Sequence, residues 1–150
     1  MIRRYVDGDV FFIDVQEQQR HEFDMAVKSF DQVGKFSLIN GESGEVLAVF
    51  GYDINHRFVA ECFALLSKNI GRKILQLVRF LKKCIPIIMK ENNINCAIMT
   101  VKCDFIQAKK MARMLEFTAG DILPQFFCGF DYQVFERRKN VYLCNDCGRS

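Results

Sequence analysis

The sequence lacks any apolar run approaching the ~20 residues that a bilayer-spanning helix needs, which argues against an integral membrane protein. It also lacks an N-terminal stretch that combines a basic start, an apolar run and a small-residue cleavage site, so we expect no secretion. Seven cysteines in 150 residues are too few for a disulfide-stapled scaffold, and we expect reduced thiols. Tryptophan, internal repeats and low-complexity segments are absent as well.

What is present suits one ordinary globular domain. Half of the residues are hydrophobic and 26% are charged, which is enough for one packed core and leaves no room for two. The net charge of +3 permits binding to anions without demanding nucleic acid. We expect a single domain over residues 1–137 and a polar C-terminal tail over 138–150.

The first half of the chain predicts a strand, one or two helices and a meander of three antiparallel strands. The helices fall between Asp9 and Gly34, with Asp9 as the N-cap, because its carboxylate can accept a bond from a first-turn amide. Residues 40–44 and 53–56 are rich in turn formers and separate the meander strands. The strands are expected at Ile2–Val6, Lys35–Ile39, Glu45–Tyr52 and Arg57–Leu66.

The second half begins with an amphipathic helix from Gly71, which we expect to kink or stop near Ile85 because Pro86 removes an amide. The next strand, Asn95–Val101, is apolar on both faces, as in a strand covered on both sides. A right-handed crossover then places this strand parallel to the last meander strand.

The chain closes with one more helix and a strand pair. Asp104 is expected to cap the helix. Residues 121–124 precede the two closing strands, about Gln125–Cys128 and Tyr132–Arg137.

This order of elements resembles the GNAT (Gcn5-related N-acetyltransferase) superfamily. The run Ala60-Glu61-Cys62-Phe63-Ala64-Leu65-Leu66-Ser67 with the basic helix after it, and the run from Ala108 to Phe117, are similar to the internal virion protein A family of short-tailed bacteriophages. The resemblance implies an α/β fold of GNAT type, a mixed sheet with a three-strand antiparallel meander. It also implies a splay between the strand ending near Leu66 and the strand beginning near Asn95, which would be the ligand cleft.

Two functions follow from the resemblance. One is a phage component, virion-associated or ejected, with a degenerate acyl-CoA site and other virion proteins as partners. The other is an active acyl-CoA-dependent N-acetyltransferase that uses acetyl-CoA and an amine on a protein or small molecule. The location implied is the phage virion or the host cytoplasm.

A candidate anion site precedes the basic helix. GNAT enzymes hold the pyrophosphate of acyl-CoA with a loop of the form Arg/Gln-x-x-Gly-x-Gly/Ala at a helix N-terminus. The matching stretch is Lys68-Asn69-Ile70-Gly71-Arg72-Lys73. Lys68 supplies the first cation and Gly71 the first glycine, whereas Lys73 replaces the final small residue and could cover the amides. Alternatively, Gly71 simply starts a helix and the cations form a solvated face.

Glu61 is the candidate catalytic base, because it is the only charged residue between Phe58 and Leu66. If its side chain points inward, loss of solvent should raise its pKa; if it points outward, it has no chemical role. The family's tyrosine acid falls on Ala112, and Glu116 replaces its usual glycine. Together with Lys73, these departures predict a fold that is kept while efficient acetyl transfer is lost. Tyr132 or a water is left as a substitute acid.

No metal site is expected. Cys144 and Cys147 have the spacing of half a zinc site, but no second pair accompanies them. Three other thiols, Cys62, Cys84 and Cys96, lie in apolar runs and are expected in the core. The basic helix either presents a solvated face or makes weak nonspecific DNA contact. Its cations are Arg72, Lys73, Arg79, Lys82, Lys83 and Lys90.

Overall fold

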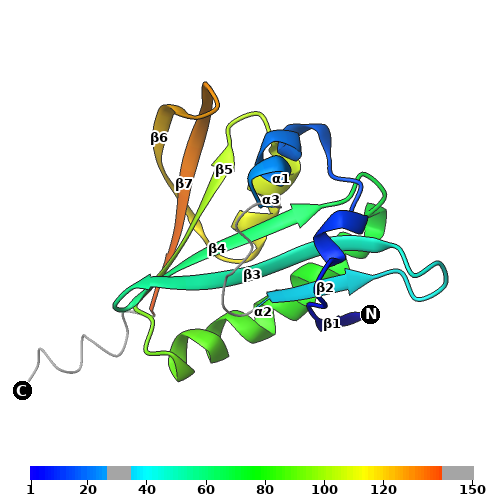
Figure 1. Cartoon of the computed structure of the whole chain (residues 1–150). Coiled ribbons are helices and arrows are strands. Elements are labelled where there is room, and N and C mark those ends of the chain that lie inside the picture. Colours follow the sequence, from blue (N-terminus) through cyan, green and yellow to red (C-terminus); the bar gives the residue numbers. More distant parts are fainter. Residues whose placement is uncertain (27–34, 140–150) are drawn as a thin grey trace, which may run out of the picture.

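The computed structural model describes residues 1–26 and 35–139 of the chain (Figure 1). The elements follow the predicted order of a strand, short helices, a meander, a helix, a strand, a helix and a strand pair. They are β1 (Ile2–Arg4), η1 (Asp9–Phe12), η2 (Glu17–Gln19), α1 (Arg20–Ala26), β2 (Lys35–Ile39), β3 (Val46–His56), β4 (Val59–Leu66), η3 (Gly71–Lys73), α2 (Ile74–Glu91), β5 (Cys96–Lys102), α3 (Ile106–Met114), β6 (Thr118–Phe127) and β7 (Phe130–Arg138). None of the helices described is long and apolar enough to cross a membrane.

The strands of the described residues form one mixed sheet of seven strands in the order β1-β2-β3-β4-β5-β7-β6. Among these strands only β4 and β5 pair in parallel, as the crossover through α2 requires, and every other neighbouring pair is antiparallel. The predicted fold class, a mixed α/β sheet with a three-strand meander and one parallel crossover, is therefore confirmed.

The sheet carries apolar side chains on both faces, because successive residues of a strand point to opposite sides. On one face, Ala48 and Phe50 belong to the main core with Leu77 of α2. On the other face, Val49 packs in a second cluster with Val10 of η1. Figure 1 shows α2 running beneath the sheet while the η1–α1 segment lies above it. The N-terminal segment is thereby held against the end of β4.

The parallel pair separates soon after it forms. The register joins Val59–Glu61 to Cys96–Ile98, and no later residue of β4 pairs with β5. Figure 1 shows β5, β6 and β7 turning away from β4 beyond this point. The predicted splay between these strands is confirmed, and it leaves the second half of β4 without a strand on that side.

Of the two effects predicted for Pro86, a kink or a stop near Ile85, the stop does not occur. Helix α2 continues through Pro86 to Glu91, because Met89, one turn beyond, is buried in the core. Pro86 itself is exposed, so water can bind the carbonyl that its missing amide leaves without a donor.

Two strand boundaries also differ from expectation. Strand β3 runs to His56, and the turn falls at residues 57–58, where Phe58 adopts a φ of 70°. Strand β6 begins at Thr118 and includes residues 121–124, which were expected to precede it. In both places strand pairing continues into residues expected to lie outside the strands, through Asp53 and His56 of β3 and through Ile122 and Leu123 of β6.

The predicted caps at Asp9 and Asp104 are wrong as well. Asp9 is buried within η1, where its carboxylate accepts bonds from the Arg3 guanidinium at 2.7 and 2.9 Å and from the Ser37 hydroxyl at 2.7 Å. It therefore fastens the N-terminal segment to β1 and β2. Helix α3 has Phe105 as its N-cap, with no side-chain cap bond. The expected helix beyond Ala26 falls partly on residues 27–34, outside the described part.

Candidate active site in the sheet opening

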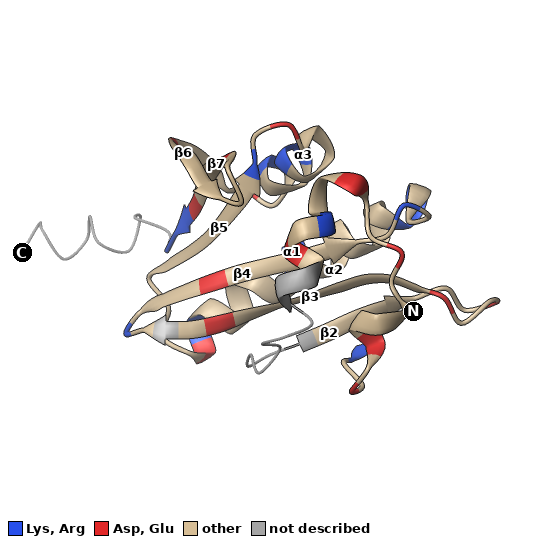
Figure 2. Ribbon diagram, turned by 45° about the horizontal axis from the view of Figure 1, so that its top comes forward, with Lys and Arg blue, Asp and Glu red and all other residues tan. Residues whose placement is uncertain are grey.

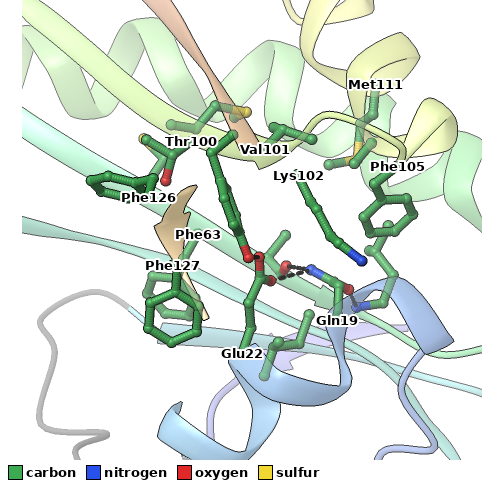
Figure 3. Close-up of a pocket in the computed structure, with 17 residues that line it drawn as sticks. Gln19, Glu22, Phe63, Thr100, Val101, Lys102, Phe105, Met111, Phe126 and Phe127 are labelled. Atoms are coloured by element: carbon green, nitrogen blue, oxygen red, sulfur yellow. Dashed lines mark hydrogen bonds between the residues drawn. The ribbon is translucent and has the colours of Figure 1, made fainter. Parts of the chain in front are cut away.

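A cavity of about 330 Å³ lies where β4 and β5 diverge. Its lining comes from β4, β5, α3, the η2–α1 segment and the β6–β7 hairpin, so residues far apart in the sequence meet there (Figure 3). Most lining side chains are apolar, and a few polar groups point into the space between them. This combination is typical of small-molecule sites, whose volumes begin at about 300 Å³.

Gln19 binds the free edge of β4 at this cavity. Its amide nitrogen donates to the Ala64 carbonyl at 2.7 Å, and its amide oxygen accepts from the Leu66 amide at 2.8 Å. These are the backbone groups that β5 would have bonded had the strands stayed paired. The buried Gln19 side chain thus satisfies the strand edge and holds η2 in place.

A carboxylate, a phenol and an imidazole form a chain beside Gln19. The Tyr132 hydroxyl donates to Glu22 Oε1 at 2.7 Å, and Gln19 Nε2 donates to Glu22 Oε2 at 3.2 Å. His21 Nε2 lies 2.5 Å from the same hydroxyl. Because the phenol has one hydrogen and gives it to Glu22, His21 must donate from Nε2.

Tyr132 stays protonated at neutral pH. Burial raises the pKa of its phenol well above the usual range, and the hydrogen bond to the Glu22 carboxylate raises that pKa further. Its side chain is only 3% exposed. The cavity therefore contains a phenol that can donate a proton, hydrogen-bonded to a carboxylate that can receive one.

Lys102 brings a cation to the same cavity. Its side chain is 10% exposed, and its ammonium lies 3.5 Å from Asp104 Oδ2 and 3.9 Å from the centre of the Phe130 ring. Figure 3 shows the Lys102 side chain directed toward Gln19, whose amide in turn contacts Glu22. The lining of the cavity therefore includes a basic residue from β5 and an acidic residue from α1.

Glu61 is not part of this arrangement. By strand alternation it shares a face with Phe63 and Leu65, yet it is exposed and does not line the cavity. The inward-pointing, buried side chain that the sequence allowed for Glu61 is therefore not found. Glu22 is the carboxylate that the fold brings into the opening.

The candidate anion segment begins at Lys68, two residues after the end of β4. Lys68 pairs with Asp14 at 3.4 Å, and the Asn69 side chain donates to Glu45 at 2.7 Å. Gly71 has a φ of +48°, which favours glycine, and the space where its Cβ would lie is open.

The remaining residues of the segment differ in their exposure to solvent. Ile70 is buried in the core, whereas Gly71, Arg72 and Lys73 are exposed at the start of η3. Figure 2 shows basic positions where β4 leads into α2. The segment and the cavity lie at the same end of β4, since Leu66 lines the cavity.

Sequence reasoning found part of this site. It named the opening and left Tyr132 as a substitute acid, but it missed Gln19, His21 and Glu22. These three residues lie in a polar helical stretch whose only signal was its density of polar residues. Ala112, at the position expected for the acid, is fully buried in the core.

The described residues offer no metal centre. Across 1–26 and 35–139, no three His, Cys, Asp or Glu side chains gather closely enough to hold an ion. Cys144 and Cys147 fall outside this part of the chain. Burial raises the pKa of the Cys62 thiol to about 12, so it behaves as a core residue, as expected.

Comparison with known proteins identifies the fold. No protein-family model matches the sequence, and no curated protein matches it. The resemblance to the phage family is therefore not reproduced.

Solved structures, in contrast, match over almost the whole chain. A GNAT-family acetyltransferase from Bacillus anthracis superposes with a TM-score of 0.69 at 8% identity, over 91% of this chain and 93% of that one. Ard1 from Thermoplasma volcanium gives 0.70 at 13%, over 93% and 97%. A ribosomal-protein-S5-alanine acetyltransferase from Vibrio fischeri gives 0.66 at 12%, over 93% and 92%. The chain has the fold of the GNAT acetyltransferases.

Proposed function

We propose that this protein is an acyl-CoA-dependent N-acetyltransferase whose active site is the cavity between β4 and β5. The observation that carries the proposal is the hydrogen-bonded pair of Glu22 and Tyr132 in that cavity. Acetyl transfer to an amine needs a base for the ammonium and an acid for the departing thiolate, and this pair supplies both. The shared fold supports the same activity.

The reaction would proceed in two linked proton transfers. Glu22 accepts a proton from the acceptor ammonium, and the free amine nitrogen forms a bond to the thioester carbonyl carbon. The carbon–sulfur bond then breaks, and Tyr132 gives its proton to the sulfur. Because Tyr132 is bonded to Glu22, the proton held by Glu22 restores the phenol. The second amine proton leaves to solvent, so the products are the amide and the CoA thiol.

Lys68–Lys73 is the segment we propose for the pyrophosphate. Gly71 leaves room for a ligand to approach the backbone, and the start of η3 and α2 provides amides and positive charge. The exposed cations Arg72 and Lys73 add to that charge. Lys68 is partly engaged by Asp14 through an exposed ion pair, which contributes little stability and is easily exchanged.

No described feature favours a virion-associated role or a lost active site. Tyr132 offers an acid in place of the one missing at Ala112, which removes one of the three reasons to expect degenerate chemistry. The exposed cations of α2 are equally compatible with a solvated face and with weak DNA contact.

The test is binding followed by turnover. Calorimetric titration of acetyl-CoA and desulfo-CoA should release heat, and an amine panel should release CoA thiol. Glu22→Gln should lower turnover by about 10²–10⁴-fold, the usual contribution of one acid–base group, with little change in acetyl-CoA affinity. Glu61→Gln is the matched control and should retain turnover. Absence of heat at high micromolar acetyl-CoA would reject the proposal.

A further inference from the structure

The cavity holds one carboxylate and one ammonium among its lining residues. Glu22 enters from α1 and Lys102 from β5. A site for a purely cationic acceptor would be expected to carry carboxylates without a lysine, because a nearby ammonium repels the ligand. The presence of both charges in the lining of one cavity instead suits a ligand that carries both signs.

Lys102 has incomplete partners for a buried charge. Its ion pair with Asp104 is long, at 3.5 Å, and the Asp104 side chain is 66% exposed. The Phe130 ring covers another side of the ammonium but accepts no conventional hydrogen bond. A buried ammonium is stabilised when further oxygens take its donors, so a ligand carboxylate would complete this site.

Glu22 also retains capacity for a ligand. Its two oxygens accept one bond from Tyr132 and one from Gln19, while a carboxylate has about four acceptor positions. The remaining positions suit an ammonium, which is the group that must lose a proton there.

The rest of the lining is apolar and aromatic. Phe63, Phe105, Phe126 and Phe127 approach the cavity from three different parts of the fold (Figure 3). The volume of about 330 Å³ is at the small end for ligand sites. The space therefore fits a compact apolar group better than an extended chain.

We propose that the acceptor is a free α-amino acid with an apolar side chain. Its ammonium lies at Glu22, its carboxylate at Lys102 and its side chain among the phenylalanines. The inference rests on the proposed transferase function and specifies its substrate class. The amino nitrogen forms the new bond to the acetyl carbon, the carbon–sulfur bond breaks, and the sulfur leaves as the CoA thiol with the proton from Tyr132.

The test compares matched acceptors on the full-length protein. L-phenylalanine and L-leucine are assayed against phenethylamine and isoamylamine, which lack only the carboxylate, and against spermidine. The wild type should prefer each amino acid over its decarboxylated partner in kcat/KM by at least about tenfold, the size of one charge-assisted hydrogen bond. Lys102→Met should raise KM for the amino acids by at least about tenfold and abolish their preference over the decarboxylated partners. Lys110→Met, an exposed change on α3, is the control.

Three other results would contradict the inference, and each has a different meaning. Equal or better use of phenethylamine or spermidine by the wild type would reject the amino-acid acceptor while leaving the transferase function intact. An equal loss toward all acceptors in Lys102→Met would show a structural role for the lysine. If acetyl-CoA neither binds nor is consumed with any acceptor, the proposed function fails and the inference falls with it.

Discussion

Replacing Gln19 by leucine tests how the opened edge of β4 is stabilised. The substitution keeps the size of the side chain but removes the amide that binds the Ala64 carbonyl and the Leu66 amide. Each buried backbone group left without a partner costs about 1–3 kcal/mol, so two groups cost roughly 2–4 kcal/mol after partial rehydration. For a domain of this size, the melting temperature should fall by about 5–15 °C.

Gln18→Leu is the matched control, because Gln18 is the neighbouring residue of the same short helix and is half-buried. Thermal and urea unfolding of both variants should show a large loss for Gln19→Leu and a change within about 0.5 kcal/mol for Gln18→Leu. Equal losses in the two variants would refute the idea that the Gln19 amide replaces the missing strand. A change in the urea m-value would point instead to an altered unfolded state.

Three further predictions concern the site and the N-terminal segment. Tyr132→Phe should lower kcat by about 10²–10⁴-fold with acetyl-CoA affinity kept, measured by thiol release and calorimetry; unchanged kcat would remove the phenol from the chemistry. Asp9→Asn should lower the free energy of unfolding by about 1–3 kcal/mol at pH 7, measured by urea unfolding. The loss stays in this range because the Arg3 partner is partly exposed. Burial raises the pKa of Asp9, but bonds from Arg3, Val6 and Ser37 outweigh it and lower that pKa overall. The stabilisation by the Asp9 carboxylate is therefore full above about pH 4 and is lost as the pH falls below it. The stabilities of the wild type and Asp9→Asn should become equal toward about pH 2. A stability difference that stays constant with pH would contradict this. Gly71→Ala should lower the free energy of unfolding by about 1 kcal/mol, because residue 71 has a positive φ, and should leave the cavity intact. Thermal unfolding measures the first effect and turnover the second.

The opening between β4 and β5 was expected because the order of elements resembles the GNAT superfamily, and the resemblance implies a splay at this point. The meander and the crossover follow from hydrophobic alternation and helix periodicity, and these patterns are long enough to read without a structure. A stop at Pro86 was one of the two effects that local chemistry predicts there, whereas burial of Met89 keeps α2 continuous.

The chemistry of the opening was harder to predict. Gln19 and Ala64 are separated by 45 positions in the chain, and their contact depends on how η2 packs against β4. Glu61 looked favourable because it was a lone charge in an apolar strand, but exposure is decided by what covers that part of the sheet. Pairing between Glu22 and Tyr132 likewise depends on tertiary packing, which no local motif encodes.

Strand β6, at the edge of the sheet, affects whether copies of this protein can pair strand to strand. It forms one border of the sheet and exposes Ile122 and Phe126, a combination that invites pairing with a second chain. Pro124 lies between them without an amide to donate, and the register with β7 shifts on both sides of the pair Ile122 and Leu123. An incoming strand would find an interrupted row of donors and acceptors, so this border resists the edge-to-edge growth that leads to aggregation.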